Sequence, residues 1–132
     1  MAEEPRYRGW RLDELWIIHI SWSDWSADHL MQRTKRHPDD PEELNLAAEW
    51  ATEAALDQYG LLDISKQNDL RVLGWSPNAP AASWSEHRGR VLRVILKPVD
   101  IVDGHWSGVT AAPANQTWTR YYWRERARLD LA

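Results

Sequence analysis

The residues that could do chemistry in this chain are mainly arginines and polar aromatic rings. Arginine outnumbers lysine 13 to 3, and the aromatic residues are ten Trp and four Tyr, with no Phe. The planar guanidinium fork suits bidentate contacts to phosphate or carboxylate. Each Trp or Tyr ring adds a face for stacking and an N–H or O–H that needs a partner when buried. Base stacking, carbohydrate stacking and a protein-binding surface all remain open, beside the simpler role of core residues.

Several other kinds of chemistry have no support in the sequence. Cysteine is absent, so we expect no disulfide, thiolate metal site or cysteine nucleophile. The five histidines show no His-Glu-x-x-His spacing, and we therefore expect no metal site. There is no glycine-rich phosphate loop and no Gly-x-Ser-x-Gly elbow, which disfavours nucleotide-dependent and serine-hydrolase chemistry. We expect no cofactor.

Charge is distributed unevenly along the chain. The formal net charge is −4, but residues 38–70 hold nine acidic residues and one lysine, whereas residues 71–97 hold five basic residues and one acidic residue. Arg33, Lys35 and Arg36 form a second basic cluster. Salt limits the reach of surface charges to about 8–10 Å, so a basic face is compatible with a negative total. Binding of a nucleic acid is therefore not excluded by the net charge.

Length and hydropathy indicate one domain. A chain of 132 residues has the size of a single domain, and we assign residues 1–13 to an N-terminal arm and residues 14–132 to the domain. No apolar run approaches the roughly 20 residues that a membrane span needs. The first residues lack the apolar core of a signal peptide. We therefore expect a soluble, cytoplasmic protein without membrane contact.

The first half of the chain predicts one strand and two helices. Residues 15–22 alternate as a half-buried strand does, with Trp16, Ile18, Ile20 and Trp22 on one face. Ser23 to Ser26 offers capping chemistry for a helix over residues 27–36. Asp40, Pro41 and Glu43 have the spacing of an N-cap, a first helical position and a capping box, which predicts a second helix from there to Gly60.

The second half of the chain predicts a sheet followed by a helix. Strands are expected over residues 61–64, 71–75, 90–96 and 106–112, with a long loop at 76–89 and a turn at Asp103-Gly104. Asn115 is the expected N-cap of a last helix over residues 116–129. The predicted fold is α+β: strand, helix, helix, then an antiparallel sheet of three to four strands and a C-terminal helix, with the helices on one face.

Four short segments in this order resemble a known family. They are Trp22-Ser23-Asp24-Trp25; Lys35-Arg36-His37; Arg71 to Ser76 followed by Arg88 to Ile95; and Val109 to Ala114 running on to Tyr121-Tyr122. Together they resemble the RelE-like toxin superfamily of bacterial toxin–antitoxin systems, and within it the BrnT branch. The likeness covers about residues 16–122.

The resemblance implies a metal-independent endoribonuclease that acts on mRNA and is neutralised by a cognate antitoxin. Proton transfer and phosphate stabilisation are the tasks of such a site. Carried over by position, the catalytic residues would be His37, Arg90 and Tyr122. The RNA-binding residues would be Lys35, Arg36, Arg71, Arg88 and Arg120. A homodimer through the acidic second helix is a further option.

Two alternatives stay open beside the ribonuclease. Ala112 stands where the family carries an arginine, which favours a non-catalytic relative that binds a protein or RNA partner through its basic or Trp-rich surface. The ten Trp alone would also fit a sugar-stacking or general protein-binding domain. Arg90 and Arg93 are three positions apart on one predicted strand, so they point to opposite faces and cannot both line one site.

Overall fold

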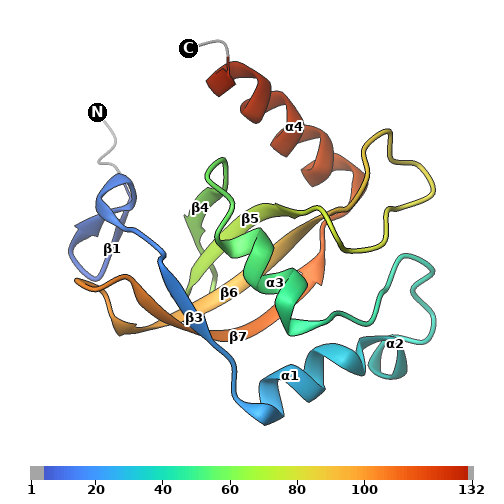
Figure 1. Cartoon of the computed structure of the whole chain (residues 1–132), viewed down its shortest axis with the longest axis horizontal. Helices are drawn as coiled ribbons and strands as arrows, with labels where there is room; N and C mark the ends of the chain where they lie inside the picture. Colours follow the sequence, from blue (N-terminus) through green and yellow to red (C-terminus); the bar gives the residue numbers. More distant parts are fainter. Residues whose placement is uncertain (1–4, 131–132) are drawn as a thin grey trace.

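A five-stranded mixed sheet forms the centre of the fold (Figure 1). The computed structural model describes residues 5–130, and its strands lie in the order β3-β7-β6-β5-β4. The strands are β3 (His19–Ser21), β4 (Leu61–Ile64), β5 (Leu70–Ser76), β6 (Arg90–Asp100) and β7 (His105–Pro113). Neighbours from β4 to β7 are antiparallel, whereas β3 pairs with β7 in parallel. The predicted α+β class and single domain are confirmed, and all four predicted strands after residue 60 are present.

Within residues 5–130, four α-helices accompany the sheet: α1 (Asp24–Met31), α2 (Arg33–Arg36), α3 (Ala48–Ala55) and α4 (Gln116–Asp130). Helix α3 packs on β5 and β6, and α1 packs on β7. We call the side of the sheet under α3 the covered face. Its central residues are fully buried Leu70, Val72, Leu92, Val94 and Leu96. Gly74 also lies on the covered face. A Cβ at this position would be 1.8 Å from the Ala54 carbonyl oxygen of α3, so a larger residue does not fit there.

Helix α4 packs on the opposite side, which we call the cleft face. Its Tyr122 forms a second core cluster with Leu73 and Val91, whose side chains point away from the covered face because neighbouring strand residues alternate. Figure 1 shows α4 set apart from α1–α3. The prediction that the helices share one face is therefore wrong. The pattern of α4 shows that it is amphipathic, but not which face of the sheet it covers.

The predicted second helix begins seven residues later than expected, at Ala48 instead of Pro41. Asp40 Oδ1 accepts a hydrogen bond from the Glu42 backbone N–H at 2.9 Å, which forms a turn, and α3 starts only at Ala48. Glu43, the expected capping-box residue, instead binds Arg33 through both carboxylate oxygens at 2.7 and 3.2 Å. A buried ion pair to another element has replaced the local cap.

The first predicted strand is shorter than its alternation suggests. Only His19–Ser21 pairs with β7, because β7 itself begins at His105. Trp16 and Ile18 are 54% and 56% exposed, so their expected place on a half-buried face is wrong. The following helix begins at Asp24 and is interrupted at Gln32, giving α1 and α2. The Ser23 side chain caps α1 by accepting from the Ser26 N–H, as predicted.

The described part of the predicted N-terminal arm is a small hairpin. Strands β1 (Arg6–Tyr7) and β2 (Trp10–Arg11) pair antiparallel and lead into a 3-10 turn at Leu12–Glu14. Tyr7 is buried against Trp106, with ring centres 5.8 Å apart. Residues 1–4 of the arm lie outside the described residues. Within residues 5–130, no helix has the length and apolar character needed to cross a membrane.

Candidate anion and base-binding cleft

A cleft of about 630 Å³ lies between α4 and the edge of the sheet at β4, β5 and β6. We call it the arginine cleft. The sheet contributes Leu61, Leu62, Asp63, Arg71, Leu73 and Arg93. The helix contributes Thr117, Trp118, Arg120, Tyr121 and Arg124. The lining therefore holds four arginines against one carboxylate, a local excess of three positive charges.

The start of α4 is held by its N-cap. The side-chain oxygen of Asn115 accepts the Trp118 N–H at 2.8 Å, as the sequence predicts. This bond satisfies one of the donors that a helix leaves free at its first turn. It directs the first turns of α4, with Trp118 and Arg120, along the rim of the arginine cleft.

The middle of α4 is anchored to the cleft face by Tyr122. This side chain is fully buried, and its hydroxyl donates to Asp57. One turn later, the Arg126 guanidinium lies 4.5, 5.2 and 5.1 Å from the ring centres of Tyr59, Trp75 and Trp123. Such cation–π contacts contribute about 0.5–2 kcal/mol each. The helix is therefore a fixed wall of the arginine cleft.

On the sheet side, Arg71 is already paired. Its Nε and Nη2 donate to the two carboxylate oxygens of Asp63 at 2.7 and 2.5 Å. These hydrogen bonds to Asp63 raise the pKa of Arg71 above its ordinary value, although burial acts in the other direction. Asp63 and Arg71 are register partners on β4 and β5. Arg71 is thus a fixed donor at the edge of the cleft whose charge is largely compensated.

Arg93 is a partly buried arginine of the cleft for which the described structure shows no ion pair. Its Nε atom is shielded from solvent, and that atom has no hydrogen-bond partner in the described structure. Burial lowers the pKa of Arg93, and the charges of Arg71 and Arg33 lower it further. Buried charges in proteins are normally paired or bound to a ligand. An anion in the arginine cleft would supply the missing partner.

Two aromatic rings stand at the helix side of the cleft. Trp118 and Tyr121 are 39% and 37% exposed and meet edge to face, with ring centres 5.9 Å apart. The Arg124 guanidinium lies 5.8 Å from the Tyr121 ring centre. Exposed rings beside unpaired cations can stack a planar base while the cations bind its phosphate. Among the described residues, the lining of the cleft contains no histidine.

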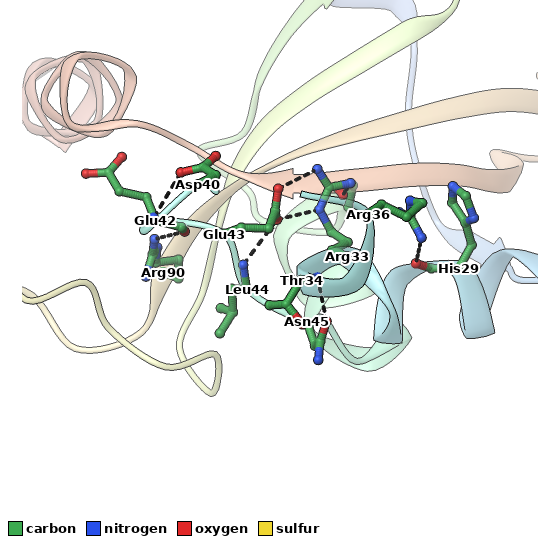
Figure 2. Close-up of polar contacts among 11 residues, drawn as sticks. His29, Arg33, Thr34, Arg36, Asp40, Glu42, Glu43, Leu44, Asn45 and Arg90 are labelled. Atoms are coloured by element: carbon green, nitrogen blue, oxygen red, sulfur yellow. Dashed lines mark hydrogen bonds and ion pairs between the residues drawn. The ribbon is translucent and has the colours of Figure 1, made fainter. Parts of the chain in front are cut away.

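The predicted site residues of α2 lie elsewhere. His37 ends α2 and is exposed together with Lys35 and Arg36. Arg36 donates to the His29 carbonyl oxygen at 2.7 Å (Figure 2). Burial, followed by the charges of Arg36 and Arg33, lowers the pKa of His29. This basic group is separate from the arginine cleft.

Arg90 belongs to the same side as α2. Its Nη2 donates to the Glu42 carbonyl oxygen at 3.3 Å (Figure 2). The next residue, Glu43, accepts a hydrogen bond from Arg33, the first residue of α2. Burial lowers the pKa of Arg90, and the nearby acids Glu42 and Glu43 oppose that effect. Arg90 and Arg93 therefore point to opposite faces, as the alternation of β6 predicts.

The remaining predicted residues divide between the cleft and the core. Arg71 and Arg120 come together in the arginine cleft. Arg88 lies in the loop before β6, with its guanidinium 5.9 Å from the Trp75 ring centre. Tyr122 is an anchor in the core, where burial and then Asp57 raise its pKa. The structure thus gathers only two of the eight predicted residues in this cleft.

The sequence reasoning did not select Arg93, Trp118, Tyr121 or Arg124 as site residues. The helical residues could have been found, because positions 118, 121 and 124 follow one another at the three-residue spacing of neighbours on a helix. Arg93 could be placed beside Arg71 only with the register of β5 and β6, in which Leu73 faces Arg93 and Arg71 faces Ile95. The two arginines are 22 positions apart in the chain, so local periodicity does not reveal that they are neighbours.

Comparison of the chain with models of protein families, with curated proteins and with solved structures gave no significant match. The class that the structure defines is therefore a single α+β domain with a mixed five-stranded sheet and an arginine-rich cleft under its C-terminal helix.

Proposed function

We propose that this protein binds single-stranded RNA in the arginine cleft. The observation that carries the proposal is Arg93, a partly buried cation whose Nε lacks a partner in the described structure. A phosphate in the cleft beside the Arg93 guanidinium would neutralise a charge for which the described structure shows no ion pair. Arg120 and Arg124 on α4 would contact neighbouring phosphates from the other wall of the cleft.

Base recognition would fall to Trp118 and Tyr121. Stacking of a base on an aromatic ring contributes about 1–3 kcal/mol and tolerates any base, because every base has a π-face. Unpaired bases are free to stack in this way, whereas those of a duplex are already stacked. The resemblance of the chain to RelE-like toxins favours RNA over DNA as the ligand.

Cleavage of the bound RNA stays a prediction of the resemblance alone. The residues it implies for catalysis are His37, Arg90 and Tyr122, and all three are outside the lining of the arginine cleft. Its implied antitoxin partner, and a homodimer, likewise remain predictions. We therefore propose binding as the function and treat metal-independent cleavage as a separate question for the same experiment.

The proposal can be tested by fluorescence anisotropy with a short labelled RNA without secondary structure, in EDTA. We expect Arg93→Gln and Trp118→Ala each to weaken binding about tenfold, the effect of losing about 1.4 kcal/mol. Three phosphate contacts predict a slope of about −2 for the logarithm of affinity against the logarithm of salt concentration. DNA of the same sequence and an oligosaccharide serve as competing ligands.

Matched controls exist on the same molecule. Arg128 lies on α4, pairs with Glu125 and is outside the cleft, so Arg128→Gln should bind RNA as the wild type does. Trp25 is 70% exposed but lies on α1, and Trp25→Ala should likewise leave binding unchanged. Absence of RNA binding at low salt, or equal losses in test and control variants, would overturn the proposal. Denaturing gels of the same samples, with His37→Ala and Arg90→Ala, test cleavage independently.

A further inference from the structure

Two histidines from distant parts of the chain lie side by side, outside the lining of the arginine cleft. His19 of β3 and His105 of β7 are register partners in the parallel pair. Their ring centres are 4.7 Å apart, and the ring planes make an angle of 53°. Both point away from the covered face, because the neighbouring residues Ile20 and Trp106 are buried in it and strand side chains alternate.

Two hydroxyl side chains extend this pair along the same face. Ser21 and Ser107 are the next register partners on the same side of β3 and β7. Ser21 Oγ lies 3.2 Å from His105 Nε2. The His19 ring makes no hydrogen bond to any residue that the structure describes, so its nitrogens are free for a ligand. His19 and Ser21 are exposed and His105 is partly exposed, so a solute can reach the group.

We propose that His19 and His105 form a binding site for a divalent transition-metal ion such as Zn²⁺. Neutral imidazole is a preferred ligand of Zn²⁺, with Zn–N distances of about 2.0–2.1 Å. Two nitrogens on one tetrahedral ion then lie about 3.4 Å apart. Tilted rings with centres 4.7 Å apart reach this separation by rotation about their terminal side-chain bonds, which are soft.

The other ligand positions would be filled by hydroxyl and water. Within residues 5–130 there is no cluster of three or more His, Asp or Glu side chains that could hold a metal. Asp100 is the register partner of His105 on β6, but its carboxylate accepts the Asp103 N–H at 3.1 Å. Ser21 Oγ, which already lies beside His105, is the remaining protein atom that could bind the metal ion. The proposed site is therefore open and exchangeable.

An ion bound here would join the shortest pairing of the sheet. Strand β3 has three residues, lies at the sheet edge and pairs in parallel with β7, and parallel pairing is the less stable kind. Only the folded chain holds the two histidines together. Ions that bind the folded state alone raise the unfolding temperature by mass action. The bound metal ion would cross-link β3 and β7.

The test is titration of the full chain, free of any histidine tag, with Zn²⁺ by isothermal calorimetry near pH 7.5. We expect one ion per chain, and a weakening of at least tenfold in His19→Gln and in His105→Gln. His87→Gln is the control, since His87 stacks on Trp123 instead, and it should bind Zn²⁺ as the wild type does. Nitrogen spectra of the five histidine rings should show Zn²⁺ shifts at His19 and His105 only.

Thermal unfolding supplies a second measurement. Zn²⁺ at about 100 times its Kd should raise the unfolding temperature of the wild type by about 5 °C or more, and that of His19→Gln by at most about half as much. The proposal is overturned if the wild type shows no binding at millimolar Zn²⁺. It is equally overturned if His19→Gln binds as the wild type does, or if the shifted rings belong to other histidines. Far-UV circular dichroism verifies that the variants are folded.

Discussion

The two faces of the sheet are built from the same strands but for opposite purposes. On β6, Leu92 is fully buried under α3 on the covered face, whereas its neighbour Arg93 lines the arginine cleft on the other side. The covered face is closed by small and aliphatic side chains, and Gly74 lets α3 approach its backbone. The cleft face carries arginines and is only partly covered by α4. One face therefore supplies stability, and the other keeps charges accessible at a cost in stability.

The largest expected difference between the faces lies in two ion pairs, Arg33–Glu43 beside the covered face and Arg71–Asp63 in the cleft. Arg33 and Glu43 retain 12% and 6% of their side-chain exposure, whereas Arg71 and Asp63 of the cleft retain 28% and 48%. Removing one partner of a buried pair leaves the other charge buried and unpaired. Glu43→Gln should therefore lower the free energy of unfolding by about 3–5 kcal/mol. Asp63→Asn should cost less than about 1 kcal/mol. Urea denaturation measures both, and similar losses would contradict the distinction between the faces.

Neighbouring positions on β6 give a second comparison. Leu92→Ala should lower the free energy of unfolding by about 2–5 kcal/mol through lost burial and a residual cavity. Arg93→Met removes a desolvated charge and keeps the aliphatic stem, so stability should change by less than about 1 kcal/mol or rise. RNA binding should fall only in Arg93→Met, measured at a temperature where both are folded. A large destabilisation by Arg93→Met would show that Arg93 supports the fold.

A substitution at Tyr122 tests whether this residue, which the resemblance implies for catalysis, instead stabilises the core. Loss of its hydroxyl in Tyr122→Phe should lower the free energy of unfolding by about 1–2 kcal/mol, because Asp57 loses a donor. RNA binding should stay unchanged. Burial and Asp57 raise the pKa of Tyr122 above its ordinary 10.0, so its contribution is complete below pH 10 and decreases at higher pH. The wild type should therefore lose more stability than Tyr122→Phe between pH 10 and 12.

The smallest expected effect is the loss of stability at acid pH through protonation of Glu43. Burial acts to raise the pKa of Glu43, but the hydrogen bonds from Arg33 and the Leu44 N–H bring it below its ordinary 4.5. The folded chain therefore takes up a proton at Glu43 less readily than the unfolded chain does. The stabilisation is present above pH 4.5 and is lost as the pH falls below that value. Between pH 5 and pH 3, the free energy of unfolding measured by urea denaturation should fall more steeply for the wild type than for Glu43→Gln.

Local signals predicted those elements whose hydrogen bonds are local or whose pattern is simple. The four strands after residue 60 agree closely with the alternation of their residues, and Ser23 and Asn115 cap α1 and α4. The predicted start of the second helix at Asp40 is wrong, although the local pattern there is strong. Glu43 can cap a helix or pair with Arg33, and the buried pair with Arg33 is what the structure contains (Figure 2).

The candidate sites were harder to predict than the elements. Arg71 and Arg120 were selected from the sequence, but the arginine cleft also needs Arg93, which the register of two strands brings beside them. His19 and His105 are separated by 86 positions and become neighbours only through the parallel pairing of β3 with β7. Spacing motifs detect ligands within one element, so neither group is visible in the sequence alone.

By itself the sequence determined the α+β class, the order of the elements and the excess of arginine over lysine. These properties follow from side-chain periodicity, capping residues and composition, all of which act within a few residues. Only the tertiary structure decided which face α4 covers, that Trp16 is exposed and that Arg93 and His105 face away from the covered side. The physical reason is that packing and strand register depend on contacts between distant segments, and those contacts outweigh local preference wherever the two compete.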